Sequence, residues 1–338
     1  MIESTEKIRK TYPQEWHEYN QAQTNEKAKF QELLYELCRN VEELPRKNIN
    51  AGRNRLPLGE MIFAVCFKVY SLVSGRRFIS DLQEANRRGF ISHTPHFNSI
   101  FNYLELEEMT DILKQMIVES SLPLKSVEHD FAVDSSGFST GLYKKWVYTK
   151  WGKPEFPGKQ KPCVKLQDWV KVHLMCGVKT NIITAVEITH ARAGDSPQFM
   201  PLVEQTSQNF HMHEVSADKA YSSAKNLQLV LVKGGQPFIP FKKNTNTNSY
   251  WDKRQPAIWK KMYHQYMANQ DEFMLHYHKR SNVETTFSMI KRKFGERLRS
   301  KHKTAQVNEV LCKILCHNLC SLVQSIYELG VEVDFSRE

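Results

Sequence analysis

The pattern of apolar residues changes near residue 130, and this change limits the fold more than any other feature of the chain. Before it, apolar side chains recur at helical spacing; after it, short segments of strand length alternate with helical ones. The strand segments are 131–138, 170–176, 182–189, 214–218 and 236–241, and the helical ones are 197–209, 222–233 and 277–291. The chain therefore predicts an antiparallel meander of three strands, followed by helix, strand, helix, strand and helix.

The last of these helical segments carries two unlike faces side by side. At about 100° per residue, Tyr277, Arg280, Glu284 and Lys291 fall within an arc of roughly 60°. A neighbouring apolar stripe, which should face a core, consists of Val283, Phe287, Ile290 and Phe294. On spacing alone, Arg280 and Glu284 could be an ordinary ion pair one helical turn apart on a solvated face.

Three motifs give this helix a second interpretation. The gaps between Tyr277, Arg280, Glu284 and Lys291 match the Tyr-Arg-Glu-Lys signature of a large group of transposases of bacterial insertion sequences. Upstream, Asp134 in Phe-Ala-Val-Asp134-Ser-Ser-Gly and Asp218 in Ser-Ala-Asp218-Lys-Ala-Tyr-Ser resemble the two aspartate motifs of that family. The resemblance covers roughly residues 126–325, and the first part of the chain resembles the family only loosely.

This resemblance implies a fold and a set of functional residues. Members of the family are DDE enzymes with a ribonuclease-H-like catalytic domain, so Asp134, Asp218 and Glu284 would be the catalytic, metal-binding carboxylates. Tyr277, Arg280 and Lys291 would contact DNA near the cut end. Taken singly, each acid could instead be a strand-end or helix-cap carboxylate, as we expect for Asp130 and Asp195.

The predicted order of elements agrees with the motifs. It is the order of an α/β, ribonuclease-H-like mixed sheet flanked by helices, in which the first and fourth strands are neighbours. Asp134 and Asp218 would then meet, and the last helix would deliver Glu284. Carboxylate oxygens suit Mg²⁺, with Mn²⁺ as a substitute, and two such ions about 3.5–4 Å apart can cleave a phosphodiester.

Residues 1–125 are expected to be all-α and to bind DNA. Two short helical segments, 79–88 and 95–106, could form a helix-turn-helix in which Phe101 packs inward while Asn98 and Asn102 face outward to read bases. An ordinary helical hairpin with a polar outer face is the alternative. The catalytic domain would occupy residues 126–338, with a short insertion at about 242–269.

Basic residues outside the three motifs indicate further DNA contacts. Arg292 and Lys293 begin a basic track after the signature helix. Residues 139–165 interleave lysines with aromatics that include Trp146 and Trp151, a pattern that suits phosphate contact and base stacking. A surface loop whose aromatic rings pack against the core would have the same sequence pattern.

The amino-acid composition limits the kinds of binding partner and the cellular compartment that we expect for the protein. The formal net charge of +10 and the pI of about 9.1 favour a polyanionic partner, although a basic housekeeping protein would share them. Seven scattered cysteines suit a reducing compartment. We see neither a signal peptide nor an apolar run of about 18 residues, so we expect a cytoplasmic protein without a membrane segment.

These observations together predict a DNA transposase. It would cleave double-stranded DNA at the ends of its insertion sequence and transfer the strands into target DNA, and the family implies a homodimer. Two alternatives stay open: another ribonuclease-H-like nuclease or resolvase, and a domesticated DNA-binding protein without activity. The three acids argue against the last, since a silent protein does not need them.

Overall fold

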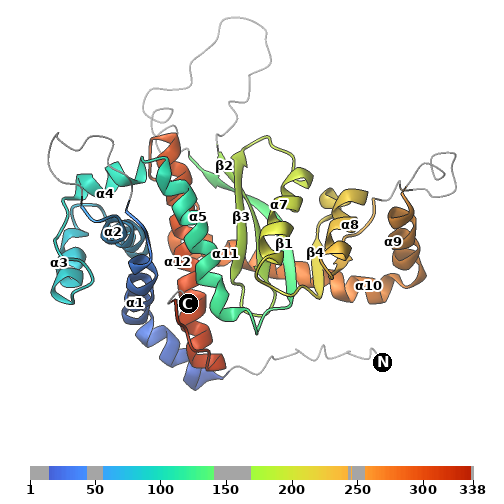
Figure 1. The fold of residues 1–338 in the computed structure, drawn as a ribbon, viewed down its shortest axis with the longest axis horizontal. Helices are drawn as coiled ribbons and strands as arrows, with labels where there is room; N and C mark the ends of the chain where they lie inside the picture. Colours follow the sequence, from blue (N-terminus) through green and yellow to red (C-terminus); the bar gives the residue numbers. More distant parts are fainter. Residues whose placement is uncertain (1–14, 44–55, 141–168, 243–244, 246–255, 336–338) are drawn as a thin grey trace, which may run out of the picture.

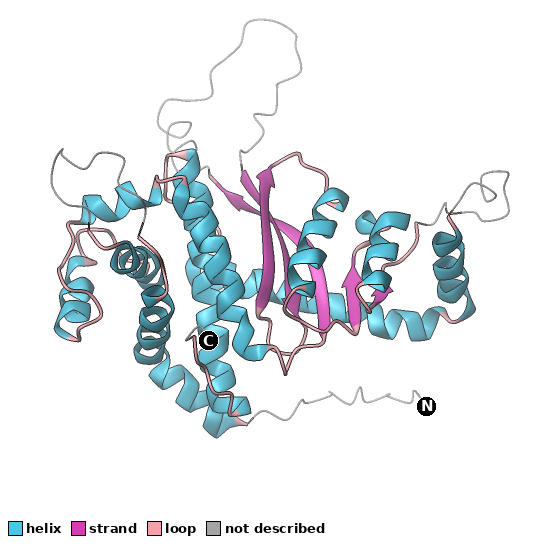
Figure 2. Ribbon diagram, in the orientation of Figure 1, coloured by secondary structure: helices cyan, strands magenta, loops and turns pink. Residues whose placement is uncertain are grey.

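The computed structural model describes residues 15–43, 56–140, 169–242, 245 and 256–335, and the account below is confined to them. Figure 1 shows the N-terminal helices at one end of the long axis, a sheet in the middle and a helical extension at the other end. Figure 2 shows that all the strands belong to the middle part.

Within the described residues, five helices precede the sheet, and six are interspersed with its strands or follow them. The first five are α1 (Trp16–Arg39), α2 (Leu58–Ser71), α3 (Ile79–Arg87), α4 (Phe97–Leu104) and α5 (Glu108–Ser121). The others are α7 (Ser196–Ser207), α8 (Ala224–Val232), α9 (Ala257–Ala268), α10 (Gln270–Tyr277), α11 (Ser281–Phe294) and α12 (Lys303–Leu329). Short 3₁₀ turns in the described part of the chain are η1 (Leu122–Leu124), η2 (Lys219–Tyr221) and η4 (His278–Arg280).

The sheet has the strand order β3-β2-β1-β4-β5. Its strands are β1 (Asp130–Ser139), β2 (Trp169–Gly177), β3 (Ile183–His190), β4 (Glu214–Ala217) and β5 (Gln236–Phe238). The first three pair antiparallel, while β4 pairs parallel with β1 and with β5. This mixed sheet, flanked by helices and preceded by an all-helical region, confirms the predicted fold class.

Alternation along β1 divides the core between two faces of the sheet. Phe131 and Val133 point toward α7 and α8, whereas Ala132 and Phe138 point toward α11 and α12. Asp134 has the same parity as Ala132 and Phe138, so it lies on the α11 face. The sheet is therefore a middle layer between two layers of helices, and its α11 face carries the signature helix.

Helix α12 joins the N-terminal helices to the sheet. It packs against α1, α2 and α5, and one continuous apolar core contains Phe30 of α1, Phe63 of α2, Leu174 of β2 and Leu315 of α12. By length and composition α12 could cross a bilayer, but 78% of its most apolar window is buried inside the molecule. The division into residues 1–125 and 126–338 stays a prediction, and the shared core means that neither part buries its apolar surface alone.

A buried carboxylate holds the turn between β2 and β3. Glu128, 1% exposed, accepts hydrogen bonds from the Lys179 N–H at 3.1 Å and from the N–H and hydroxyl of Thr180 at 2.5 and 2.7 Å. Gly177 lies against it, and a β carbon there would lie 2.2 Å from the Glu128 carboxyl carbon. Only glycine therefore leaves room for this carboxylate.

We expect Gly177→Ala to destabilise the protein by about 1–3 kcal/mol, because the added methyl group overpacks a site whose neighbour is fixed by three hydrogen bonds. Urea unfolding measures the change. Gly194→Ala is the matched control, since its β carbon would meet only the Pro197 ring at an ordinary 3.7 Å. Equal stability of the two variants would contradict this account of the turn.

Candidate active site

Three acids come from three different elements. Asp134 lies within β1, Asp218 directly follows β4, and Glu284 lies in the first turn of α11. The parallel register of β1 and β4 sets Val133 opposite Ala217, so Asp134 and Asp218 are the next residues along two neighbouring strands. The expected meeting of these two strands is confirmed.

Asp134 is half-buried, with 21% of its side chain exposed, and both of its carboxyl oxygens accept hydrogen bonds. Its Oδ1 accepts the Ser135 N–H at 2.8 Å, and its Oδ2 accepts from Nη1 of Arg280 at 2.6 Å. Burial raises the pKa of the Asp134 carboxyl, and the charges of Asp218 and Glu284 raise it further. The Ser135 hydrogen bond and Arg280 act in the opposite direction without cancelling the rise. Asp134 therefore lies within reach of the charges of both other acids.

Asp218 is also half-buried, whereas Glu284 is exposed. Asp218 caps η2, where its Oδ1 accepts the Lys219 N–H at 2.5 Å. The Glu284 side chain is 57% exposed and forms an ion pair with Nη2 of Arg280. Two half-buried carboxylates and one exposed carboxylate therefore supply the oxygen atoms of the site.

Arg280 bridges two of the acids. One of its terminal nitrogens donates to Asp134 and the other to Glu284, while the guanidinium lies 5.9 Å from the centre of the Tyr277 ring. The predicted helix from Tyr277 is divided here: Tyr277 ends α10, η4 spans the next three residues, and α11 begins at Ser281. Arg280 thus occupies the junction of two helices and not the interior of one.

A group of ion pairs and hydrogen bonds that the sequence did not reveal fixes this junction to the sheet. Lys279 donates to Asp130 at 2.7 Å and to Glu214 at 2.8 Å, and His276 is paired with the other oxygen of Glu214 at 2.8 Å. Asp130 and Glu214 face each other at the start of β1 and β4. Asp130 is therefore a structural carboxylate, as expected. Its position in the sequence did not indicate that it would pair with Lys279.

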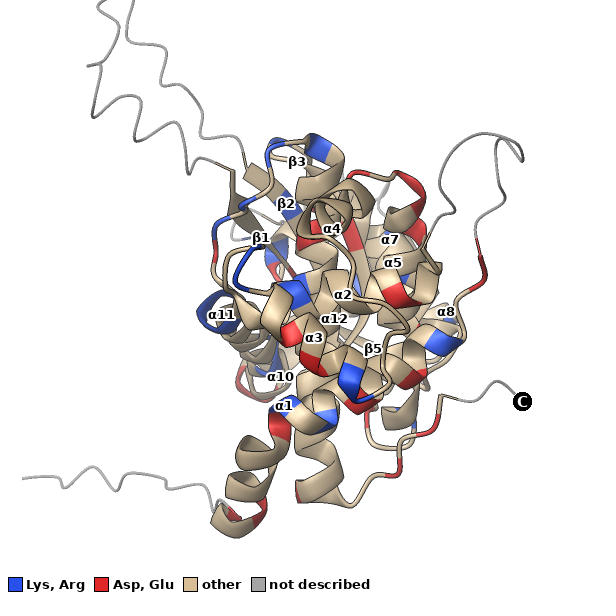
Figure 3. Cartoon of the chain, turned by 90° about the vertical axis from the view of Figure 1, so that its left-hand side faces the viewer, with Lys and Arg blue, Asp and Glu red and all other residues tan. Residues whose placement is uncertain are grey.

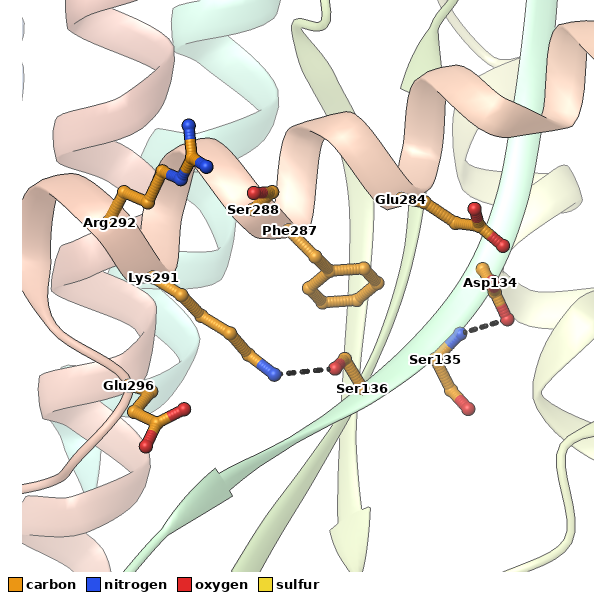
Figure 4. A pocket seen from close by; sticks show the side chains of 9 residues that line it. All are labelled: Asp134, Ser135, Ser136, Glu284, Phe287, Ser288, Lys291, Arg292 and Glu296. Atoms are coloured by element: carbon orange, nitrogen blue, oxygen red, sulfur yellow. Dashed lines mark hydrogen bonds between the residues drawn. The ribbon is translucent and has the colours of Figure 1, made fainter.

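An open pocket of about 490 Å³ lies between β1 and α11, as Figure 4 shows. Asp134 and Glu284 stand at one end, and at the other the ammonium of Lys291 donates to the Ser136 hydroxyl at 2.8 Å. The remaining lining residues are Ser135, Phe287, Ser288, Arg292 and Glu296. Burial lowers the pKa of Lys291. In Figure 3, basic residues gather around α11 and the adjacent ends of β1 and β2.

Other residues proposed from the sequence lie apart from this pocket. Lys293 points toward the N-terminal helices, where it forms an ion pair with Glu26 and lies 5.9 Å from the centre of the Tyr70 ring. Asn98 and Asn102 are exposed on α4, as expected. Trp146 and Trp151 belong to residues 141–168, outside the described part of the chain.

The expectation that Phe101 packs inward is wrong. Its side chain is 41% exposed and lies over Gly75, where an added β carbon would be 2.9 Å from the ring. Helix α4 is short and packs mainly on α2 and α12, and only Ile100 and Leu104 of the helix are fully buried. The outer face of α4 therefore carries an aromatic ring beside its two asparagines.

Beneath Asp134, the opposite face of the sheet holds a polar network that the sequence did not predict. Asp195 accepts from the Ser135 hydroxyl at 2.7 Å and pairs with Lys171 at 2.7 Å. Although burial opposes it, these hydrogen bonds hold the pKa of Asp195 below its usual value. Burial lowers the pKa of His173, 3.4 Å from Asp195, to about 4, so that imidazole is neutral. Asp195 thus supports the strand next to Asp134.

The donor set suits a hard divalent cation, because it consists of carboxylate oxygens from two half-buried acids and one exposed acid. In the described residues, however, no three acid, histidine or cysteine side chains converge closely enough to hold one ion. Arg280 lies between two of the acids instead. The residues therefore fit Mg²⁺ by chemistry, in an arrangement where a guanidinium neutralises them.

Comparison with known proteins bears on residues 125–319, which match a family model described as "Transposase DDE domain". The matched segment is more than half of the chain and includes Asp134, Asp218, Glu284 and Lys291. No curated protein and no solved structure matches the chain.

The opposite pKa shifts of two aspartates predict opposite effects of neutralising them. The folded-state pKa of Asp134 is raised, so its ionisation destabilises the fold above that pKa and has no effect well below the unfolded value. The folded-state pKa of Asp195 is depressed, so its ionisation stabilises the fold above the unfolded value, and this contribution is lost as pH falls through the folded pKa.

In buffer free of divalent ions, Asp134→Asn should therefore unfold at a higher temperature than wild type at pH 7, and Asp195→Asn at a lower one. Both differences should shrink as the pH is lowered toward 3. Thermal unfolding followed by circular dichroism measures them. Destabilisation of both variants by the same amount at pH 7 would show that the two carboxylates do not differ in this way.

Proposed function

The chain belongs to the family of transposases with a DDE domain, and from that premise we propose that it cuts DNA at the ends of an insertion sequence and joins those ends to target DNA. The observation that carries this proposal is the position of Asp134, Asp218 and Glu284 on β1, β4 and α11 of one sheet-and-helix unit. Burial, and to a smaller extent the charges of Asp218 and Glu284, raise the pKa of Asp134, and a bound cation would offset both effects.

These acids would hold Mg²⁺, or Mn²⁺ in its place, which when bound supplies Lewis-acid activation of the attacking hydroxyl and stabilisation of the leaving oxygen. Everything else in the site would position DNA. Lys291 and Arg292 line the pocket and are cations within reach of a phosphate. Tyr277 and Arg280 stand at the other end, beside the acids. A DNA end would lie along the pocket from Glu284 to Lys291.

Helix α4 is proposed to read the sequence of the element's ends. Its exposed Asn98 and Asn102 are side chains that can pair with adenine in a major groove. Arg76 lies over the Phe97 ring at 5.0 Å and adds a cation to the same surface. Because the N-terminal helices share their core with α12, DNA binding by this region is to be measured on the full chain. We further propose a homodimer that holds two ends, acting in the cytoplasm.

The proposal predicts that Glu284→Gln cuts a labelled duplex carrying an end of the insertion sequence at least roughly a hundredfold more slowly than wild type in Mg²⁺. Amide substitution keeps the size of the side chain and removes the charge that a metal ion requires. Binding of the duplex, followed by gel shift in buffer free of divalent ions, should be nearly unchanged.

Glu296→Gln is the matched control, because Glu296 is another exposed acid that lines the same pocket. Its cleavage rate should stay within about twofold of wild type, as for most surface substitutions. Full cleavage by Glu284→Gln, or equal loss in the two variants, would refute the proposed catalytic site.

A further inference from the structure

Arg280 pairs with two of the three acids that are proposed to hold metal. Its side chain is 18% exposed, and its two terminal nitrogens donate to Asp134, at 2.6 Å, and to Glu284. The planar fork of a guanidinium presents a separate terminal nitrogen to each of the two carboxylates. Arg280 thus neutralises two of the three acids from within the chain.

We propose that Arg280 is an internal counterion that competes with the divalent metal for Asp134 and Glu284, and that a DNA phosphate draws it away from them. The inference rests on the proposed function, since it assumes that these acids hold metal. A guanidinium and a metal ion repel each other and need the same oxygens, so tight metal binding requires Arg280 to leave. The free enzyme then binds metal weakly, and binding of DNA completes the site.

The surroundings of Arg280 allow its side chain to move while its backbone stays in place. The neighbouring Lys279 fixes η4 to the sheet through Asp130 and Glu214, so the junction does not depend on the bridge. The pocket opens directly beside Glu284 and leads toward Lys291 and Arg292. A phosphate in this space could accept two hydrogen bonds from Arg280. It is negatively charged, like the carboxylates from which Arg280 would move away.

Lys291 provides a comparison inside the same pocket. Its ammonium donates to the Ser136 hydroxyl and to no carboxylate in the described part of the chain. It therefore contributes positive charge to the pocket without occupying the acids. If positive charge alone weakened metal binding, removing Lys291 or removing Arg280 would strengthen it to a similar extent. If the ion pairs with the two acids weaken metal binding, only the removal of Arg280 should strengthen it.

The experiment measures Mn²⁺ binding to the full-length, DNA-free protein by electron paramagnetic resonance of the free ion at pH 7. Arg280→Met should lower the Kd for Mn²⁺ by about tenfold or more, which corresponds to about 1.4 kcal/mol. Lys291→Met should change it by less than about threefold. An unchanged or higher Kd for Arg280→Met, or an equal decrease in both variants, would overturn the inference.

Arg280→Lys guards against a variant that fails to fold, because it retains the charge but replaces the two terminal nitrogens, each of which now pairs with its own carboxylate, by a single one. We expect its Kd to lie between those of wild type and Arg280→Met, and a Kd equal to wild type would count against the bridge. Adding Glu284→Gln to Arg280→Met should abolish the gain in affinity, and retention of the gain would place the ion elsewhere and overturn the inference. Cleavage by Glu284→Gln alone tests the proposed function separately, so either idea can fail without the other.

Discussion

The parallel pairing of β1 with β4 is the constraint on which the rest of the site depends. These strands are separated by about eighty residues of chain, yet their register sets Val133 opposite Ala217 and so brings Asp134 and Asp218 to adjacent positions. Repulsion between two such carboxylates opposes this arrangement, and buried apolar side chains on both faces of the sheet stabilise it. Packing therefore holds together charges that would separate in solution, and this is the state in which a cation binds well.

A second constraint links the site to the N-terminal helices through α12. Buried Lys313 donates to the carbonyls of Gly295 and Arg297, and Glu309 accepts from the N–H groups of Arg299 and Ser300. These contacts fix the segment that follows α11 and runs beside the end of β1. Because α12 also packs on α1, α2 and α5, the helices proposed to read DNA and the helix that carries Glu284 rest on one common support.

The sequence predicted most of the fold, since periodicity and turn residues report local structure. The strands and their order follow from alternation and from the placement of helices between them, and the acids follow from motifs. Contacts between distant side chains were not predictable in this way. Nothing in the spacing of Arg280 and Glu284 showed that the same guanidinium also binds Asp134, and nothing in the basic run after Lys291 showed that Lys293 turns back toward Glu26. Both depend on how helices pack, which a linear pattern does not record.

The central claim is that Asp134, Asp218 and Glu284 form one metal-dependent cutting site. A substitution of Asp218 tests this claim most directly, because Asp134 and Glu284 line the same pocket and Asp218 does not. A thiolate binds Mg²⁺ poorly and softer ions better. The measurement is cleavage of the labelled end duplex by Asp218→Cys in Mg²⁺ and in Mn²⁺. The account predicts no cutting in Mg²⁺ and partial recovery in Mn²⁺, whereas undiminished cutting in Mg²⁺ would contradict it.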